Sequence, residues 1–151
     1  MDEQARQLID KASIIDTINS LFIATDERDW PGVLQCFAPQ VHFDMSSAGG
    51  GEAADVPAQE IADMWEKGLR PLKAIHHQAG NYRVTLAGDR ATAFCYGIAS
   101  HYLPKKSGHN TRTFVGTYDF QLERNGASWR IRGFRFNLKY VDGNVKLEAG
   151  G

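Results

Sequence analysis

The chain lacks the features that mark several protein classes. Cysteine occurs only twice, as Cys36 and Cys95 within apolar segments, so we expect two buried thiols and no disulfide framework. No apolar run approaches the ~20 residues that span a bilayer, so a membrane partner is not expected. Asp2, Glu3 and Arg6 stand where a signal peptide would begin its apolar core, which predicts a cytoplasmic protein.

The chain also has no excess of positive or negative charge. Seventeen Lys and Arg residues balance eighteen Asp and Glu residues, for a net charge of −1. Nucleic-acid binding normally requires a basic surface, so no nucleic-acid partner is expected. The chain is 42% hydrophobic and 23% charged, as in soluble globular proteins. We therefore expect residues 1–151 to form a single domain.

The first half of the chain has the periodicity of helices. Apolar residues recur every three or four positions over residues 3–26, which predicts an amphipathic helix. Its inward face would consist of Leu8, Ala12, Ile15, Ile18 and Phe22. Asp29 is suited to cap a second helix that ends at Pro39, and residues 58–68 predict a third helix.

Between the second and third helices the helical period is interrupted. Residues 41–45 predict a short strand. Residues 46–55 contain three consecutive glycines and no periodicity, which predicts a mobile loop that acts as a flexible lid.

The second half alternates with a period of two and predicts four long strands. Their expected ranges are residues 77–86, 91–103, 112–123 and 128–140. Asn125-Gly126 predicts a tight hairpin, because a primed turn takes positive φ at both central residues. Helices followed by an antiparallel meander predict an α+β fold in which helices cover the concave face of a curved sheet.

Asp26 is the first candidate for chemistry. It lies four residues after Phe22, so a helix that reaches it places its carboxylate on the inward face. A carboxylate there needs a histidine or arginine partner, because an unpaired buried charge costs several kcal/mol. Alternatively, the helix has already ended and Asp26 is a solvated turn residue.

His101 ends a strand that has an unusual face. The positions of the same parity are small side chains, namely Ala91, Ala93, Cys95, Gly97 and Ala99. A face of small side chains leaves space, so His101 could project into a cavity. The alternative is a closely packed helix on that face and a polar histidine at the strand end.

The other histidines give weaker signals. His76 and His77 are adjacent, so they point to opposite sides of a strand and form no chelate by themselves. His42 and His109 are interpreted as structural or solvent-exposed residues. No HExxH or CxxC motif occurs, so no metal site is expected.

Four parts of the sequence together resemble a known family. Residues 25–30 (TDERDW), residues 36–39 (CFAP), His77 and His101 are similar to the SnoaL-like branch of the nuclear transport factor 2-like superfamily, and above all to the scytalone dehydratases. The resemblance covers about residues 15–138 and implies a cone-shaped α+β barrel.

The resemblance implies catalytic roles for three residues. Asp26 corresponds to the family's catalytic aspartate, His77 to its general acid and base, and His101 to the second histidine near that aspartate. We expect Asp26 to support a protonated His101. Elimination of water from a small cyclic or aromatic hydroxy-ketone would follow, and that reaction needs no cofactor.

The resemblance also implies a substrate pocket. Two family tyrosines correspond here to Thr25 and Met45, and two polar strand residues correspond to Val115 and Thr117. Leu21 takes the place of a pocket tyrosine in bile-acid dehydratases. Without the family tyrosines, an enolate would be stabilised by ordered water or by side chains from the set Tyr96, Tyr118 and Asn137.

Other functions on the same fold stay open at this stage. An isomerase or polyketide cyclase would use the same acid–base groups. A binding protein for a small hydrophobic or aromatic ligand, or an oxygenase small subunit, would use none of them. Apolar sheet surface around Phe134 and Phe136 predicts a homodimer or homotrimer.

Overall fold

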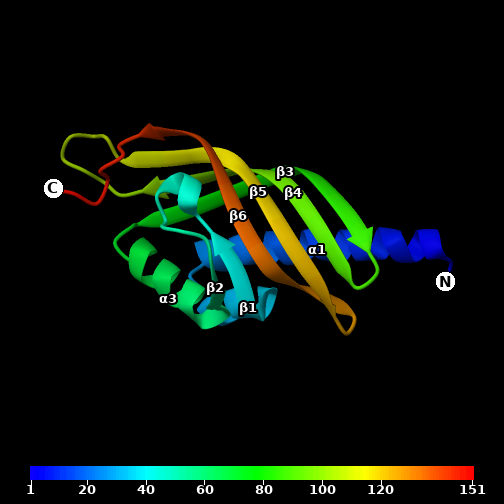
Figure 1. The fold of residues 1–151 in the computed structure, drawn as a ribbon. Helices are drawn as coiled ribbons and strands as arrows, with labels where there is room; N and C mark the ends of the chain where they lie inside the picture. Colours follow the sequence, from blue (N-terminus) through cyan, green and yellow to red (C-terminus); the bar gives the residue numbers. More distant parts are fainter.

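The computed structural model describes residues 1–151 as three α-helices packed against one six-stranded sheet (Figure 1). The strands follow the order β2-β1-β6-β5-β4-β3, and every neighbouring pair is antiparallel except β1 with β6, which is parallel. The sheet curves without closing, and the expected α+β fold is confirmed. In chain order the elements are α1 (Glu3–Asp26), α2 (Trp30–Cys36), β1 (Phe37–Asp44), the short 3-10 helix η1 (Ser46–Ala48), β2 (Ala54–Pro57), α3 (Ala58–Leu69), β3 (Ala74–Ala87), β4 (Arg90–Tyr102), β5 (Thr111–Asn125) and β6 (Ser128–Gly143).

Helix α1 begins where its sequence provides a cap. The Asp2 carboxylate accepts a hydrogen bond from the backbone N–H of Ala5, which satisfies one of the free amides of the first turn. Leu8 and Ala12 are exposed, contrary to the predicted inward face, because at about 3.6 residues per turn both lie off the stripe of α1 that faces the sheet. The buried stripe consists of Asp10, Ile14, Ile18, Leu21, Phe22, Ala24 and Thr25.

The segment between α2 and α3 differs most from expectation. Asp29 caps α2 through the N–H of Gly32, but α2 ends at Cys36 and the chain enters β1 directly, so Pro39 lies within a strand. The predicted mobile loop contains η1 and the first residues of β2. Strand β2 pairs with β1 at the edge of the sheet, and its four residues are too few to give a periodic signal.

Both ends of each of the four long strands lie within three residues of the predicted positions. Strand β3 starts at Ala74, so His77 lies inside it. The hairpin between β5 and β6 turns at Gly126 and Ala127, one position later than predicted. Only Gly126 has positive φ, at 64°, so the turn needs one glycine rather than two permissive residues.

The main core lies between the helices and the concave face of the sheet. It contains Phe134 and Phe136, which are 4% and 3% exposed and therefore provide no outer surface for an oligomer, contrary to expectation. Cys36 and Cys95 are buried and unpaired, as predicted. Neither α1 nor any other helix is long and apolar enough to span a membrane.

Candidate active site

An apolar cavity of about 220 Å³ opens beside the C-terminal end of α1. Its polar side chains are Thr25, His77, His101 and the hydroxyl of Tyr118. An enclosed cavity of ~150 Å³ already accepts benzene, so this volume suits a molecule with a single ring. The lining comes from α1, η1, α3 and four strands, and consists of Phe22, Thr25, Met45, Ala48, Trp65, Leu69, His77, Ala99, His101, Phe114, Tyr118, Phe134 and Phe136.

Asp26 and His77 form a partly buried pair at one wall of this cavity. Helix α1 continues to Asp26, whose two carboxylate oxygens accept hydrogen bonds from His77 Nδ1, at 2.6 Å, and from the His77 backbone N–H, at 2.8 Å. Their side chains are 17% and 15% exposed. The interpretation of Asp26 as a solvated turn residue is therefore wrong.

The pair leaves one ring nitrogen of His77 for a ligand. An ionised carboxylate only accepts hydrogen bonds, so Nδ1 carries the proton of the neutral ring and Nε2 holds a lone pair. No group of the protein bonds Nε2. The ring of Phe22 stacks on the imidazole, with centroids 5.3 Å apart and planes inclined by 13°, which holds its orientation. His77 can therefore act as a base.

His101 has a different partner from the one predicted. Its Nδ1 accepts a hydrogen bond from Arg112 Nη2 at 2.9 Å, so the ring proton lies on Nε2. Burial, and then the charge of Arg112, lower the pKa of His101 to about 4, which makes it neutral at pH 7. Asp26 bonds His77 instead of His101, and His101 is a neutral donor rather than an imidazolium.

Tyr118 brings a third polar group to the cavity. It is only 5% exposed, yet its hydroxyl has no hydrogen-bond partner within the protein. Burial raises the pKa of Tyr118, so the phenol keeps its proton. Its ring lies flat on β4 because position 97 is glycine, where an added Cβ would stand 2.1 Å from the ring.

The sequence matches the SnoaL-like domain model over residues 6–135. The chain belongs to the SnoaL-like domain family. This membership confirms the resemblance drawn from residues 25–30, His77 and His101. No curated protein matches the chain.

Solved structures share the architecture of this SnoaL-like domain. The Kfla4162 protein of Kribbella flavida is 23% identical, with a TM-score of 0.87 over 93% of this chain and 97% of that one. A candidate scytalone dehydratase of Novosphingobium aromaticivorans is 10% identical, with a TM-score of 0.82 over 93% and 91%. The hexachlorocyclohexane dehydrochlorinase LinA-type3 of Novosphingobium barchaimii is 14% identical, with a TM-score of 0.76 over 95% and 96%. These identities show a shared fold.

The SnoaL-like cavity includes two of the seven residues expected to bind substrate, Thr25 and Met45. The hydroxyl of Thr25 donates to the carbonyl of Leu21 at 2.7 Å and is not free for a ligand. The five expected residues that do not line the cavity are Leu21, Tyr96, Val115, Thr117 and Asn137.

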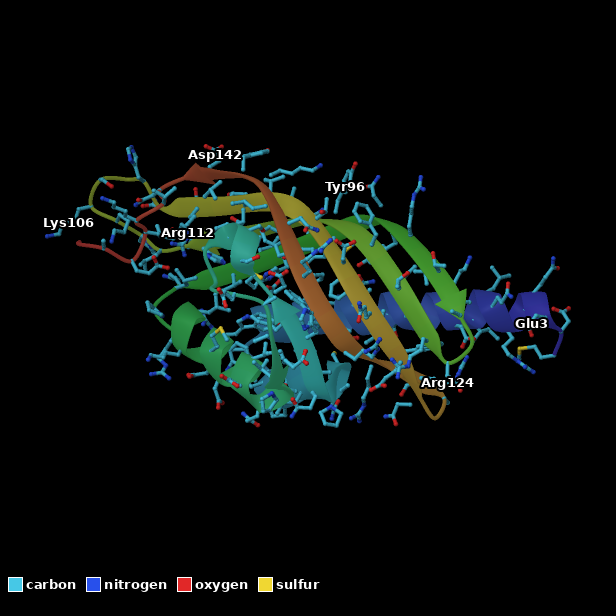
Figure 2. All side chains as sticks on the ribbon, viewed as in Figure 1. Glu3, Tyr96, Lys106, Arg112, Arg124 and Asp142 are labelled. Atoms are coloured by element: carbon cyan, nitrogen blue, oxygen red, sulfur yellow. The ribbon has the colours of Figure 1, made fainter.

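Each of these five residues lies on the wrong face of its element. Leu21 is fully buried in the main core. The other four have the strand parity opposite to that of the residues that line the cavity, so they point to the outer face of the sheet. Figure 2 shows Tyr96 on that outer face, away from α1. The amide of Asn137 there donates to Thr117 and Asp119.

Sequence reasoning missed most of the aromatic lining. The middle of strand β5 did carry the signal, because its even positions from 114 to 122 are apolar or glycine, whereas the odd positions nearby include Asp119 and Glu123. The small face of β4 is mostly filled by the main core and the Tyr118 ring. Of its small residues, only Ala99 lines the cavity.

The site has no arrangement typical of metal or thiol chemistry. No group of three or more His, Cys, Asp or Glu side chains lies together in a way that could hold a metal ion. Burial raises the pKa of Cys36 to about 11 and that of Cys95 to about 12, so both thiols are protonated at neutral pH.

Proposed function

We propose that this protein is a cofactor-independent dehydratase that eliminates water from a small, single-ring β-hydroxy ketone. The observation that carries the proposal is the Asp26–His77 pair, whose free Nε2 belongs to a residue lining an apolar cavity. A histidine oriented by a carboxylate is suited to proton transfer near neutral pH.

The first step removes a proton from the carbon between the carbonyl and the hydroxyl-bearing carbon. His77 Nε2 takes this proton, and the C–H electron pair moves toward the carbonyl to give an enolate. Asp26 stabilises the imidazolium that forms, as the aspartate of a catalytic triad does. General base catalysis of this kind contributes roughly 10²- to 10⁴-fold in rate.

Two neutral hydrogen-bond donors stabilise the carbonyl oxygen as it gains negative charge. His101 Nε2–H and the Tyr118 hydroxyl are both without partners in the protein and both belong to residues of the cavity lining. Hydrogen bonds to a developing enolate are strong in a site with few competing waters. These two side chains replace the family tyrosines, whose positions are occupied here by Thr25 and Met45.

The second step restores the enzyme. The enolate electrons return to form the C=C bond, the C–O bond to the β-hydroxyl breaks, and the leaving oxygen takes the proton from His77 Nε2. One hydroxy-ketone thus gives one enone and one water, and His77 is again a neutral base. A dehydratase and a dehydrochlorinase among the structural neighbours are named for related eliminations, which supports this reaction class.

The test measures two reactions of 3-hydroxycyclohexanone and related single-ring ketones. Deuterium uptake next to the carbonyl follows the first step by NMR, and enone absorbance follows the complete elimination. His77→Ala and Asp26→Asn should each slow both reactions by about 10²-fold or more. His42→Ala is a matched control, because His42 also bonds an aspartate, Asp55, at 2.7 Å but on the exposed surface.

Each remaining outcome identifies a different function. Deuterium uptake without loss of water would replace the dehydratase with an isomerase or a cyclase. Equal ligand binding by wild type and His77→Ala, with no uptake, would indicate a binding protein. Absence of both binding and uptake for every ketone would favour the oxygenase small-subunit alternative.

A further inference from the structure

The C-terminal segment, residues 144–151, packs against the end of the sheet that carries His101. Its Leu147 is fully buried in a small core together with Leu72 and Ile75, separate from the main core. The Asn144 backbone N–H donates to the carbonyl of Thr111, the residue before Arg112. The segment is thus fixed to the protein at Asn144 and at Leu147.

This anchoring brings Glu148 to Arg112. Both carboxylate oxygens of Glu148 accept hydrogen bonds from the guanidinium, at 2.8 Å from Nη1 and 2.6 Å from Nη2. The Arg112 side chain is only 13% exposed, and Figure 2 shows it at the start of β5 near the C-terminal segment. The same Nη2 also donates to His101 Nδ1, so one nitrogen connects the C-terminal segment to the cavity.

We propose that Arg112, held in place by Glu148, is a positioning residue that keeps His101 as the neutral tautomer with its proton on Nε2. A guanidinium donates but never accepts hydrogen bonds, so a proton on His101 Nδ1 would face a donor. The bidentate contact with Glu148 fixes the plane of the guanidinium and hence the direction of this donor. Only the use of the Nε2–H to bind a carbonyl rests on the proposed function.

The charges around His101 agree with this role. Arg112 on β5 and a protonated His77 on β3 disfavour an imidazolium at position 101, whereas Glu148 of the C-terminal segment and Asp26 of α1 favour it. Burial adds to the first effect and is the largest contribution, so the pKa is lowered. Arg112 therefore disfavours the charged form of His101, whereas Glu148 favours it. Both residues favour the neutral tautomer with the proton on Nε2.

The experiment records long-range ¹H–¹⁵N spectra of ¹⁵N-histidine-labelled protein without any ligand. Wild-type His101 should show a protonated Nε2 and an unprotonated Nδ1 at pH 7. Arg112→Gln should give a mixture of tautomers and raise the titration midpoint of His101 by about one pH unit or more. Glu148→Gln should also give the mixture but should not raise the midpoint, because the variant removes a charge that favours the imidazolium.

Arg135→Gln is the control, because Arg135 pairs with Asp119 on the exposed outer face. It should leave the His101 spectrum unchanged. The proposal is overturned by a wild-type His101 that is charged or protonated on Nδ1 at pH 7. It is equally overturned if His101 of Glu148→Gln remains entirely in the Nε2–H tautomer. The Glu148→Gln spectrum therefore tests the proposal even if Arg112→Gln does not fold. No spectrum requires turnover, so failure of the dehydratase proposal is a separate result.

Discussion

At the scale of single residues, the neutral imidazole of His101 links stability to pH. The pKa of His101 is about 4 in the folded protein and near 6.5 in an unfolded chain, because burial and Arg112 disfavour the charged ring. Between these values the unfolded chain binds more protons, so the free energy of unfolding rises with pH. Acidification from pH 6.5 to 4 should therefore remove roughly 3 kcal/mol of stability.

Urea unfolding of wild type and His101→Gln at several pH values between 4 and 7 measures this contribution. The variant should show a flatter dependence of the unfolding free energy on pH over that window. His109→Gln, in an exposed loop, should keep the wild-type slope. A slope that is equally steep in His101→Gln would contradict the assignment of a neutral, partly buried His101.

The sequence predicted which residue types meet at the site but not how they pair. The helical spacing from Phe22 placed Asp26 inward and required a histidine or arginine partner, which is the relation found. Which histidine it meets depends on the path of β3 past the end of α1, 51 residues away in the chain. Arg112 as the partner of His101 depends on the register of β4 with β5, which local periodicity does not determine.

At the scale of elements, the segment around η1 covers the cavity while attached to β6. The Ser47 hydroxyl donates to the carbonyl of Phe136 at 2.7 Å and accepts from the N–H of Leu138 at 2.9 Å. Met45 and Ala48 on either side line the cavity. The segment contributes to the cavity wall and is bonded to β6 through Ser47, in contrast to the freely mobile loop that its glycines suggest.

Ser47→Ala should release this segment without unfolding the protein. The two lost hydrogen bonds contribute about 1 kcal/mol each, so amide exchange over residues 45–55 should accelerate about thirtyfold while Tm stays nearly constant. Hydrogen-exchange mass spectrometry measures the effect. Ser46→Ala is the matched control, because the Ser46 hydroxyl bonds only Asp44. Unchanged exchange in Ser47→Ala would show that other contacts hold the segment.

Helices and strands with a strong hydrophobic periodicity could be predicted from the sequence. Strands whose formation depends on pairing with distant segments could not. Helices α1 and α3 and the four long strands appear within a few residues of the expected ranges. Strand β2 and the parallel pairing of β1 with β6 have no local signal, because both arise from contacts between distant segments. The resemblance implied that Val115 and Thr117 line the pocket, but side chains alternate along a strand and these odd positions of β5 point to the outer face, opposite to Phe114 and Tyr118.

At the scale of the whole molecule, the outer face of the sheet exposes apolar side chains. Tyr96, Ile98 and Tyr140 are 47%, 46% and 56% exposed. Val115 pairs with both Ile98 and Tyr140, so these residues form a row across three strands. The expected homodimer or homotrimer therefore has its best surface here rather than around Phe134 and Phe136.

We expect the wild type to associate through this face and Ile98→Lys to be a monomer, because the charge would be buried without a partner at the contact. Size-exclusion chromatography with light scattering gives the mass of both proteins. Val145→Lys changes another exposed apolar residue, 61% exposed in the C-terminal segment, and should leave the mass unchanged. If the wild type is a monomer, or if Ile98→Lys has the same mass as an oligomeric wild type, this face is not an oligomer interface.

On the proposed function, different walls of the cavity provide the reactive groups and the groups that select the substrate. The carboxylate–imidazole pair comes from α1 and β3, whereas bulk that shapes the hollow comes from α3 and β6, as Trp65, Leu69 and Phe134. Exchange of these bulky groups alters which molecules enter and leaves the pair in place. Natural evolution or laboratory selection can thus change the substrate through a few substitutions on α3 and β6, while α1 and β3 keep the proposed catalytic pair.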